Sequence, residues 1–424
     1  MNYKNFLNLK SIFISLFVLT IFPVKIISYP TSEKDFLLKV RLFSLLKLKE
    51  LSFKREKPFQ VIINSNHTVN ISTNTNFIKF IFSNDRIEVI NKHNNIYNGY
   101  WNSINIVSTS EDPVLVGNKL IPLRPYSGNF LILNNKHKAM KPITSQELRV
   151  HFPESPICIN IVSLNKYLAS VIHAEIWGVG NSIETLKAQA VVSRSYIFAK
   201  LNRHKNHKYN FCDTTHCQVY LGAKNIDNSI IKAVSDTSNQ VLTYNNNIIP
   251  TYFHSTCGGH TSTPKDIWQN KNIKYYLGVK DTDKNNESYC QNSPHYYWKS
   301  KIDKKQISSI FLNKETDYES INFYDWKHDS ANRVIQFTLS SKTRSIKLMG
   351  EDFRIRIGRH LGWNKIKSLI FTIKSDKNAI YFRGRGLGHG IGFCQYGAAK
   401  MGSIGKDYLS ILKHYFPKCN VSIK

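Results

Sequence analysis

Two charged side chains occupy positions in expected helices where the surrounding pattern calls for apolar residues. In residues 164–175 the apolar residues recur at helical spacing, and the stripe continues onto Glu175. In residues 183–201 a second such stripe passes through Arg194. A carboxylate on an apolar face is costly unless it is paired or protonated, so its neighbours should raise the pKa of Glu175. Packed as a helical hairpin, the two segments would bring Glu175 and Arg194 to one site, either for chemistry or as a buried ion pair.

A group of potential metal ligands follows in the middle of the chain. Cys212, His216 and Cys217 lie within FCDTTHCQVY, and residues 254–260 hold a further Cys between two His. Thiolates and imidazoles at this density can bind zinc, although C-x4-C is not a standard zinc-finger spacing. In an exported chain, a disulfide joining Cys217 to Cys212 or to Cys257 explains the same residues equally well. The count of seven cysteines leaves at least one of them unpaired.

A glycine-rich segment near the C-terminus is the third candidate. In RGRGLGHGIGFCQYGAAKMG, residues 383–402, five glycines surround His389. The segment is neither a phosphate-binding Walker loop nor a dinucleotide fingerprint, because the residues that would follow each motif are missing. Glycines let the backbone approach a ligand closely, and His389, Gln395 and Tyr396 could hydrogen-bond a polar substrate there. A compact loop around a packed His is the alternative.

The elements that must position these residues indicate an α+β fold. Residues 33–57 place apolar residues among Lys and Arg in the pattern of a basic amphipathic helix. Between residues 60 and 150, runs such as FIKFIF and RIEVI alternate with Asn-rich turns, which predicts strands. Strand patterns return in residues 334–374 as RVIQFTL, SIKLM, FRIRIG and KSLIFTI, and residues 408–416 predict a last helix. We expect a helical hairpin packed on β-rich segments and preceded by a β-rich N-terminal region.

The chain carries a large positive charge. Of 424 residues, 58 are Lys or Arg and 29 are Asp or Glu, which gives a net charge of +29. The surplus indicates an anionic partner, such as nucleic acid, a membrane surface or an acidic polymer, although the chain is also rich in Lys throughout. An apolar share of 42% excludes a disordered tail and a multi-span membrane protein.

The N-terminus narrows the choice of partner. Lys4 and Lys10 precede the uncharged run SIFISLFVLTIF, which is short for a spanning helix but suits the core of a secretory signal. We expect residues 1–28 to export the chain to the cell envelope, where they are either cleaved or kept as a membrane anchor on the outer side of the cytoplasmic membrane. An exported protein rarely meets nucleic acid, so membrane lipids and cell-wall polymers remain.

Several ordered motifs resemble the SpoIID/LytB family of cell-wall proteins over roughly residues 150–424. They are YLASVIHAE (167–175), ETLKAQAVVSRSY (184–196), CDTTHCQVY (212–220), YFHSTCGGHT (252–261), GEDFR (350–354) and GRGLGHGIGFCQYGA (384–398). We therefore expect an export segment (1–28), a basic helix with a β-rich region (29–150) and, from the resemblance, a SpoIID-like catalytic domain (151–424). Where the family usually continues its Glu with Met-Pro, this chain has Ile176 and Trp177 and a loop one residue longer.

The resemblance implies a specific activity and site. In the enzymes of this family the matching Glu is catalytic, which implies that role for Glu175. The implied reaction is lytic cleavage of the β-1,4 bond between MurNAc and GlcNAc in peptidoglycan glycan strands, leaving 1,6-anhydro ends, with one Glu as acid and then base. The resemblance also implies residues that bind the glycan: Lys187, His254, His389, Gln395 and Tyr396. Arg194 would either bind the glycan or orient Glu175.

The implied partners and cofactors follow from the same resemblance. The reaction requires no cofactor, and a structural zinc at Cys212, His216 and Cys217 is suggested by the zinc that some members bind through His and Cys. The family also includes modifiers that enhance an N-acetylmuramoyl-L-alanine amidase. The alternative function is therefore a non-catalytic, peptidoglycan-binding modifier with an amidase as partner.

Overall fold

A computed structural model of the chain describes most of the sequence in two compact units. The described residues are 36–65, 68–72, 76–83, 85–92, 94–108, 111–134, 156–176, 178–180, 182–269, 273–312 and 318–424. The expected export segment, residues 1–28, lies outside them. Within these ranges, no helix is both long and apolar enough to cross a membrane.

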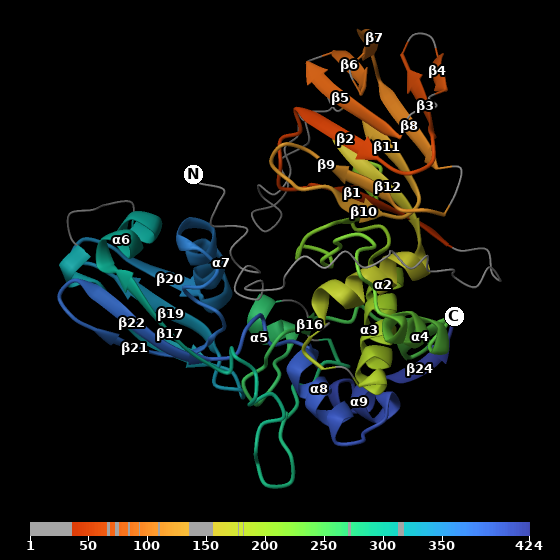
Figure 1. Cartoon of the computed structure of the whole chain (residues 1–424). Helices are drawn as coiled ribbons and strands as arrows, with labels where there is room; N and C mark the ends of the chain where they lie inside the picture. Colours follow the sequence, from red (N-terminus) through yellow and green to blue (C-terminus); the bar gives the residue numbers. More distant parts are fainter. Residues whose placement is uncertain are drawn as a thin grey trace, which may run out of the picture. The chain divides into compact units, whose positions relative to one another are not determined.

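One unit, here called the sandwich unit, comprises the described residues of 24–177 and 197–238 (Figure 1). Its larger sheet has the strand order β13-β1-β12-β11-β8-β3-β4 and its smaller sheet the order β10-β9-β2-β5-β6-β7. The larger sheet contains β1 (Leu37–Leu42), β3 (Phe59–Asn64), β4 (Thr68–Ser72), β8 (Ser103–Ser108), β11 (Asn129–Leu133), β12 (Ile157–Ser163) and β13 (Phe211–Cys212). The smaller sheet contains β2 (Glu50–Lys54), β5 (Phe77–Ser83), β6 (Arg86–Asn91), β7 (Asn94–Tyr100), β9 (Val114–Gly117) and β10 (Arg124–Tyr126).

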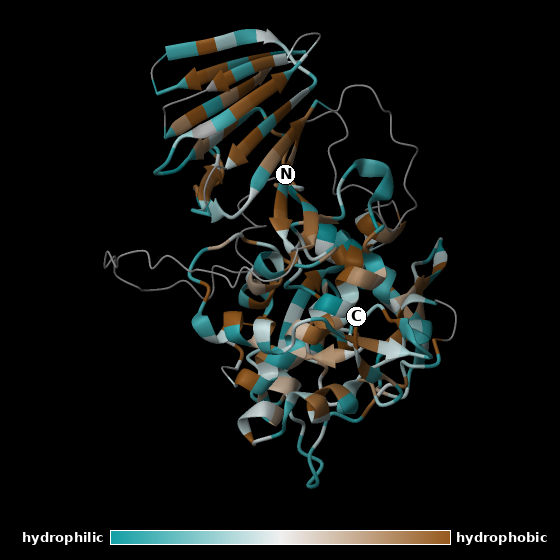
Figure 2. Cartoon of the chain, turned by 90° about the vertical axis from the view of Figure 1, so that its right-hand side faces the viewer, coloured by the Kyte–Doolittle hydropathy of each residue, from teal (hydrophilic) through white to brown (hydrophobic). Residues whose placement is uncertain are grey.

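Aromatic side chains join the two sheets of the sandwich unit. The ring of Phe53 on β2 lies 5.7 Å from that of Phe80 on β5 and 5.2 Å from that of Phe130 on β11, in the opposite sheet. All three rings are buried. Hydrophobic and hydrophilic residues alternate along these strands (Figure 2), as expected for sheets with one face packed on a core.

The helix predicted over residues 33–57 is wrong. Residues Leu37–Leu42 form β1, which pairs antiparallel with β12 and parallel with β13, and residues Glu50–Lys54 form β2. The burial of β1 alternates at its start, since Leu38 and Val40 are buried whereas Leu37 is 61% exposed. The apolar residues of LLKVRL satisfy both a helical and a strand period, and sheet pairing decides between them.

Strand β12 ties the expected catalytic region to the N-terminal β-rich region. It starts just beyond the boundary expected near residue 150, yet it is hydrogen-bonded to β1 on one side and to β11 on the other. The chain then enters α2 (Leu164–Glu175) directly from this strand, with Ser163 at the N-cap position. The predicted helix over 164–175 is therefore confirmed, and its apolar face packs within the sandwich unit, where α4 (Asn228–Asp236) lies against it.

The second predicted helix is also confirmed. Helix α3 (Ile183–Lys200) belongs to the other unit up to residue 196, and its last turn belongs to the sandwich unit. It is buried on all sides over residues 188–197, which is unusual for a helix that carries Gln189, Ser193 and Arg194. The expected meeting of Glu175 and Arg194 remains a prediction, because the two residues belong to different units.

The other unit, here called the C-terminal unit, holds the described residues of 178–196 and 239–424. Its strands form four small sheets, in the orders β15-β14-β24, β16-β23, β17-β22-β21 and β18-β19-β20. They are β14 (Gln240–Tyr244), β15 (Asn247–Ile248), β16 (Phe253–His254), β17 (Tyr297–Asp303), β18 (Asn322–His328), β19 (Val334–Ser340), β20 (Ser345–Met349), β21 (Ile370–Ser375), β22 (Ala379–Arg385), β23 (Phe393–Cys394) and β24 (Asn420–Ile423). Its further helices are α5 (Pro264–Trp268), α6 (Lys304–Leu312), α7 (Gly350–Leu361), α8 (Gln395–Ser403) and α9 (Tyr408–Tyr415). The fold is thus α+β with a β-rich N-terminal region, as predicted.

One predicted strand of the C-terminal unit is a helix. The segment FRIRIG lies inside α7, where Phe353 and Ile357 are buried one turn apart. Glu351 in the first turn forms a paired hydrogen bond with Arg354, at 2.7 and 2.8 Å. The alternating Arg and Ile residues imitate a strand, whereas the acidic first turn and the spacing of the buried residues favour the helix.

The alternation of β1 gives a direct test by mutation. Leu38→Ala should lower the free energy of unfolding by about 2–5 kcal/mol, because it opens a cavity in the sandwich core. Leu37→Ala, the same change one residue away on the exposed face, should shift it by less than about 0.5 kcal/mol. Urea unfolding of both variants measures the difference, and equal losses would contradict the strand.

Candidate functional site

Glu175 is the last residue of α2 and is held by a loop of the sandwich unit. Its side chain is half-buried, and its Oε1 accepts a hydrogen bond of 2.7 Å from the backbone N–H of Val219. A backbone donor cannot rotate away as a side chain can, so the bond fixes one carboxyl oxygen in place. The half-buried side chain of Glu175 is therefore held in one orientation at the end of α2, which is compatible with a catalytic role.

The loop that contains Val219 is anchored at both ends. At its start, the buried carboxylate of Asp213 accepts the N–H groups of Phe43 and Ser44 at 2.6 and 3.2 Å, and burial raises the pKa of Asp213 to about 6. At its end, the hydroxyl of Tyr220 donates to Asn160 Oδ1 at 2.7 Å. The loop 211–220 thus connects β1, β12 and Glu175.

The predicted ligands Cys212, His216 and Cys217 lie together within this loop. The two sulfurs are 3.5 Å apart, too far for the bond of about 2.05 Å in a disulfide, and each lies within 3.7 Å of His216 Nδ1. His204 completes the group, with its Nε2 3.3 Å from Cys217 Sγ. The four ligand atoms lie within 4.8 Å of one another. Hydrogen bonds from Cys217, His204 and His216 hold the pKa of the Cys212 thiol well below its usual range.

This donor set fits a tetrahedral zinc ion. Zinc–sulfur and zinc–nitrogen bonds of about 2.3 and 2.0–2.1 Å place neighbouring ligand atoms roughly 3.4–3.8 Å apart. The distances between the sulfur and imidazole atoms are close to that range. The sequence reasoning missed His204, because it lies eight residues before Cys212 in no standard spacing; the local excess of His and Cys was the available signal.

A second group of predicted residues meets in the C-terminal unit. Strand β16 pairs in parallel with β23, which sets His254 opposite Cys394 and next to the glycine segment. The rings of His254 and His389 are 5.5 Å apart, and both contact the backbone of Ile391. His254 Nδ1 lies 3.2 Å from the carbonyl oxygen of Ile391, and the backbone N–H of Ile391 donates to His389 Nδ1 at 3.0 Å. Gln395, the first residue of α8, is 4% exposed, and Tyr396 is partly buried.

Both histidines of this group are held neutral. Burial lowers the pKa of His254 to about 3 and that of His389 well below its usual range. If the Nδ1–H of His254 donates to the Ile391 carbonyl, its Nε2 is an acceptor, and this buried atom has no hydrogen-bond partner among the described residues. The side-chain amide nitrogen of Gln395, a donor, is likewise buried without a hydrogen-bond partner among the described residues. Buried polar atoms without partners are rare, which marks the group as a candidate binding site.

The two predicted basic residues have internal contacts. Arg194 is 1% exposed and donates to the carbonyl of Gln240 at 3.2 Å, while burial lowers its pKa to about 10. Its burial argues against direct contact with a polymer. Lys187 lies 3.1 Å from the carboxylate of Glu184 and near the ring of Tyr408. The other carboxylate oxygen of Glu184 accepts the N–H of Tyr408 at 2.8 Å.

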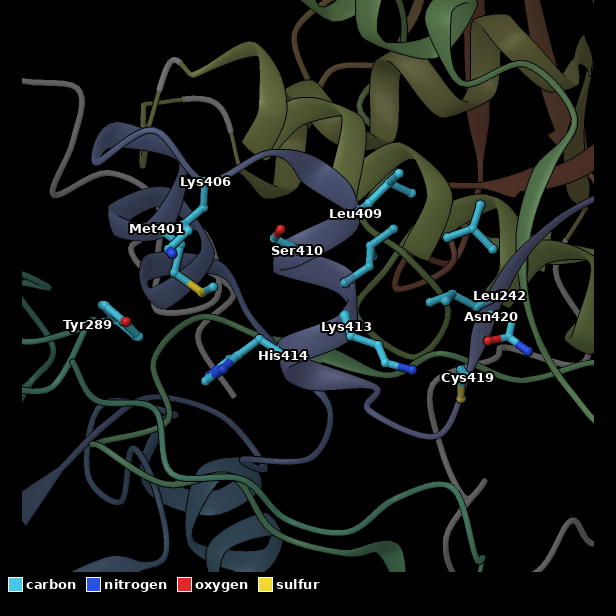
Figure 3. Close-up of a pocket in the computed structure, with 12 residues that line it drawn as sticks. Leu242, Tyr289, Met401, Lys406, Leu409, Ser410, Lys413, His414, Cys419 and Asn420 are labelled. Carbon is cyan, nitrogen blue, oxygen red and sulfur yellow. The ribbon is translucent and has the colours of Figure 1, made fainter. Parts of the chain in front are cut away.

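The C-terminal unit also has an open cavity of about 790 Å³ beside α9 and β24 (Figure 3). Its lining includes Met401, Lys406, Lys413 and His414, and none of the predicted site residues. Its volume would suit a ligand, but no group of convergent polar side chains marks it as the catalytic site.

The glycine segment packs closely against other segments of the C-terminal unit. Gly386, Gly388, Gly390 and Gly392 all have φ between +73° and +106°, a region that other residues rarely adopt. A Cβ at Gly388 would contact His254, and one at Gly390 would overlap the guanidinium of Arg333. The glycines therefore let the segment pass close to the residues that hold the histidine group.

Comparisons with known proteins match the part of the chain that holds α2, α3 and the loop 211–220. The family model of Stage II sporulation protein (SpoIID) matches residues 154–244, which contain α2, α3 and the loop 211–220. An uncharacterized protein of Brachyspira hyodysenteriae is 30% identical over 275 residues, which cover 63% of this chain and 68% of that protein. The amidase enhancer of Bacillus subtilis is 29% identical over 56% of this chain, but only 37% of that protein is covered.

A third relative carries the family name itself. Stage II sporulation protein D of Bacillus amyloliquefaciens is 27% identical over 295 residues, with 63% of this chain and 80% of that protein covered. Together these likenesses define a class of cell-wall-related proteins. The chain belongs to the SpoIID family.

The packing of the glycine segment predicts how substitutions behave. Gly390→Ala should lower the free energy of unfolding by about 1–2 kcal/mol through backbone strain, and further because it displaces the buried Arg333. Gly405→Ala has the same positive φ, at +85°, but open space around it, so only the strain applies. Thermal unfolding of the two variants compares them, and an equal shift would contradict the close approach.

Proposed function

We propose that the chain is a peptidoglycan lytic transglycosylase that cleaves the β-1,4 bond between MurNAc and GlcNAc. One observation carries the proposal. The family's acidic residue, Glu175, ends α2 half-buried, and a backbone N–H of the loop 211–220 holds its carboxyl group. A half-buried acid in a fixed orientation suits proton transfer to a bound substrate.

The proposed reaction needs one carboxyl group. Protonated Glu175 donates its proton to the glycosidic oxygen, and the bond between that oxygen and C1 of MurNAc breaks. The resulting carboxylate takes the proton from the C6 hydroxyl of the same MurNAc, whose oxygen closes on C1. The products are a free C4 hydroxyl on GlcNAc and a 1,6-anhydro end, and Glu175 is protonated again. Because the nucleophile belongs to the substrate, its proximity replaces the second carboxylate and the water of ordinary glycosidases.

Residues of the C-terminal unit would bind the glycan. The acceptor on His254 and the amide of Gln395 lack partners among the described residues, and sugar hydroxyl and N-acetyl groups offer the complementary donors and acceptors. Both histidines are neutral, so they would hydrogen-bond a sugar rather than donate a proton to it as acids. Because Arg194 is buried, it would support the site without touching the glycan.

Zinc would be held by His204, Cys212, His216 and Cys217. Four protein ligands leave no open coordination position, so the ion would stabilise structure and take no part in the reaction. It would fix the loop 211–220, whose Val219 lies two residues beyond the last ligand and donates to Glu175. By fixing this loop, the metal would help to orient Glu175 without contacting it.

The location that suits this function is the cell envelope. An exported, strongly basic protein would be attracted to peptidoglycan, whose stem peptides carry carboxylates. The segment 1–28 would deliver the chain there, as a cleaved signal or a retained membrane anchor.

A second candidate function has its own support. The similarity to an amidase enhancer favours a glycan-binding modifier that stimulates a cell-wall amidase without cleaving strands itself. Incubating the purified protein with bare glycan strands separates the two functions, since a modifier produces no anhydro ends. Adding an N-acetylmuramoyl-L-alanine amidase then tests for stimulation.

The catalytic role of Glu175 predicts the effect of a single substitution. Glu175→Gln keeps the shape and the acceptor for Val219 but cannot transfer the proton, so the rate should fall by about 100- to 10,000-fold. Mass analysis of digested glycan strands for anhydro-MurNAc ends measures it. Glu111→Gln, at a side chain that is 65% exposed, is the matched control. Full activity of Glu175→Gln would refute the assignment.

The proposed zinc predicts a second substitution. Cys212→Ser should lose about one equivalent of bound zinc and weaken hydrogen-exchange protection at Val219, because the loop loses a ligand. Elemental analysis and hydrogen exchange measure the two effects. Cys158→Ser, at another buried thiol of the sandwich unit outside the group, should leave both unchanged. Unchanged zinc content in Cys212→Ser would contradict the site.

A further inference from the structure

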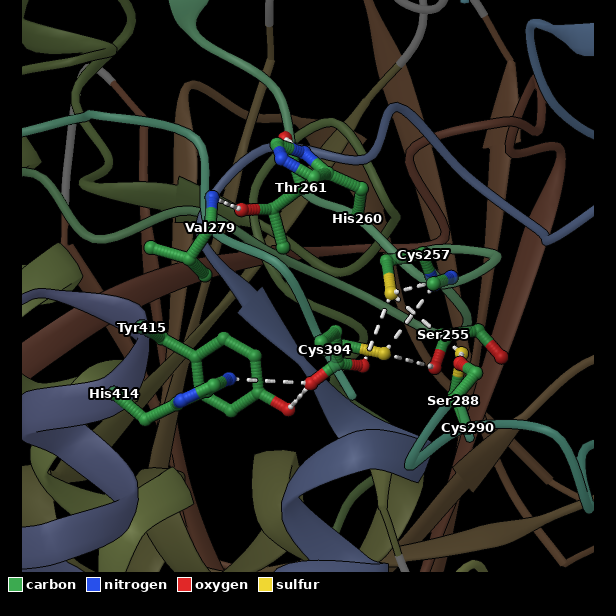
Figure 4. A network of polar contacts seen from close by, with 12 residues as sticks. Ser255, Cys257, His260, Thr261, Val279, Ser288, Cys290, Cys394, His414 and Tyr415 are labelled. Carbon is green, nitrogen blue, oxygen red and sulfur yellow. Dashed lines mark hydrogen bonds and ion pairs between the residues drawn. The ribbon is translucent and has the colours of Figure 1, made fainter. Parts of the chain in front are cut away.

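Three cysteines and one aspartate meet in the interior of the C-terminal unit. Cys257 follows β16, Asp281 and Cys290 lie on the loop between α5 and β17, and Cys394 ends β23. Their sulfur and carboxylate atoms lie within 4.8 Å of one another, and all four side chains are fully buried. Figure 4 shows the three sulfurs converging between these segments.

Two sulfurs of this group lie at the spacing of ligands that share one centre, and the carboxylate lies closer, at hydrogen-bond distance from Cys257. Cys257 Sγ lies 3.5 Å from Cys290 Sγ and 3.0 Å from Asp281 Oδ2. Ligand atoms around one tetrahedral ion lie roughly 3.3–3.8 Å apart, whereas an iron–sulfur cluster would need its own irons and sulfides between the thiolates. The spacing therefore fits a single ion better than a cluster.

Hydrogen-bond donors surround the group as they surround metal-bound thiolates. The backbone N–H of Cys257 donates to Cys394 Sγ at 3.2 Å, and that of Gly259 donates to Cys257 Sγ at 3.3 Å. Ser288 Oγ lies 3.3 Å from Cys290 Sγ. Donors aimed at sulfur stabilise its negative charge, and thiolates that bind a metal typically accept such hydrogen bonds.

The carboxylate of the group is oriented in the same way. The hydroxyl of Tyr415 donates to Asp281 Oδ1 at 2.7 Å, and His414 Nε2 lies 3.4 Å from the same oxygen, while Oδ2 faces Cys257. One oxygen is thus held by the protein and the other is turned to the sulfurs. The buried guanidinium of Arg333 donates to the carbonyl of Cys257 and adds positive charge beside the group.

We propose that Cys257, Asp281, Cys290 and Cys394 form a second metal site, which binds one Zn²⁺. Soft thiolates with one carboxylate in a compact group select zinc among the common divalent ions. Burying several ionisable groups together is costly without a cation, and a divalent ion offsets that cost. All four positions are filled by protein, so the ion is structural.

The site would organise the neighbouring histidine group. Cys394 immediately precedes Gln395 and pairs with His254 across β16 and β23, while Cys257 lies three residues beyond His254. One ion would therefore fix both strands of this small sheet and the start of α8. The inference stands on the cluster itself and holds whether or not the chain cleaves glycan.

Metal content of the full chain, purified with its thiols reduced, tests the proposal. The wild type should bind about two equivalents of Zn²⁺, and Cys290→Ser should lose one of them while keeping the other. Cys419→Ser, at a buried thiol of the same unit outside the cluster, should lose none. A zinc content that Cys290→Ser leaves unchanged overturns the site.

Cobalt substitution identifies the ligands without disabling the new site. In Cys212→Ser, Co²⁺ should occupy the C-terminal unit and give the charge-transfer absorption of three thiolates, stronger than a two-thiolate site gives; Asp281→Asn should keep this band and weaken binding. If Cys212→Ser does not fold, the three-thiolate absorption must be present in the wild type and absent from Cys290→Ser. A folded Cys212→Ser that binds no Co²⁺, or a wild type whose Cys257 is joined to Cys290 or Cys394 by a disulfide under reducing purification, overturns the proposal. Anhydro-MurNAc release is measured separately, so loss of the proposed activity does not imitate any of these results.

Discussion

The hydrogen bond from Val219 to Glu175 depends on segments from the whole length of the sandwich unit. The N–H can reach the carboxylate only while the loop 211–220 keeps its path. That path begins at β13, which pairs with β1, and continues past Asp213, which accepts N–H groups from residues 43 and 44. The N-terminal strands, which carry none of the recognised motifs, therefore hold the loop that orients the acid. A change in the packing of β1 would reach Glu175 through the loop.

Buried ionisable groups are the second constraint on the structure. Arg194 and Arg333 are almost fully buried, and two groups of thiols lie in the interiors of the two units. Each such group loses its hydration, and hydrogen bonds to backbone carbonyls recover only part of that cost. A divalent ion bound by each thiol group would offset this desolvation cost. Its binding free energy adds to the free energy of folding, because only the folded state assembles the site. The cysteines would then stabilise the fold without disulfides.

Sequence periodicity predicted the elements that are locally encoded. The stripes of 164–175 and 183–200 gave the two helices and the position of Glu175 at the end of the first, because helical spacing depends on near neighbours alone. The same logic failed where two periods fit one segment. LLKVRL reads as helix or strand, and its pairing with β12, more than a hundred residues away, decides for the strand. The segment FRIRIG also fits both periods; it was predicted as a strand but lies in helix α7.

The thiol groups show the limit of spacing as a guide to sites. Cys212, His216 and Cys217 are neighbours in sequence, so their density was visible, whereas His204 joins them from the end of α3. Cys257 and Cys394 are 137 residues apart, and only the parallel pairing of β16 with β23 brings them together. No local pattern encodes that pairing, since it rests on two strands of two residues each and on glycines with positive φ.

The charge of the chain acts at a different level from the site. With 58 basic and 29 acidic residues, at least half of the cations have no acidic partner in a one-to-one pairing, whatever the fold. Such a field attracts any polyanion, but at physiological salt it is screened beyond about 8 Å, and it cannot distinguish one glycosidic bond from another. It would raise the concentration of an acidic cell-wall polymer near the protein. A choice of bond would have to come from fixed groups at contact distance, and the carboxyl group of Glu175, held by the backbone N–H of Val219, is one such group.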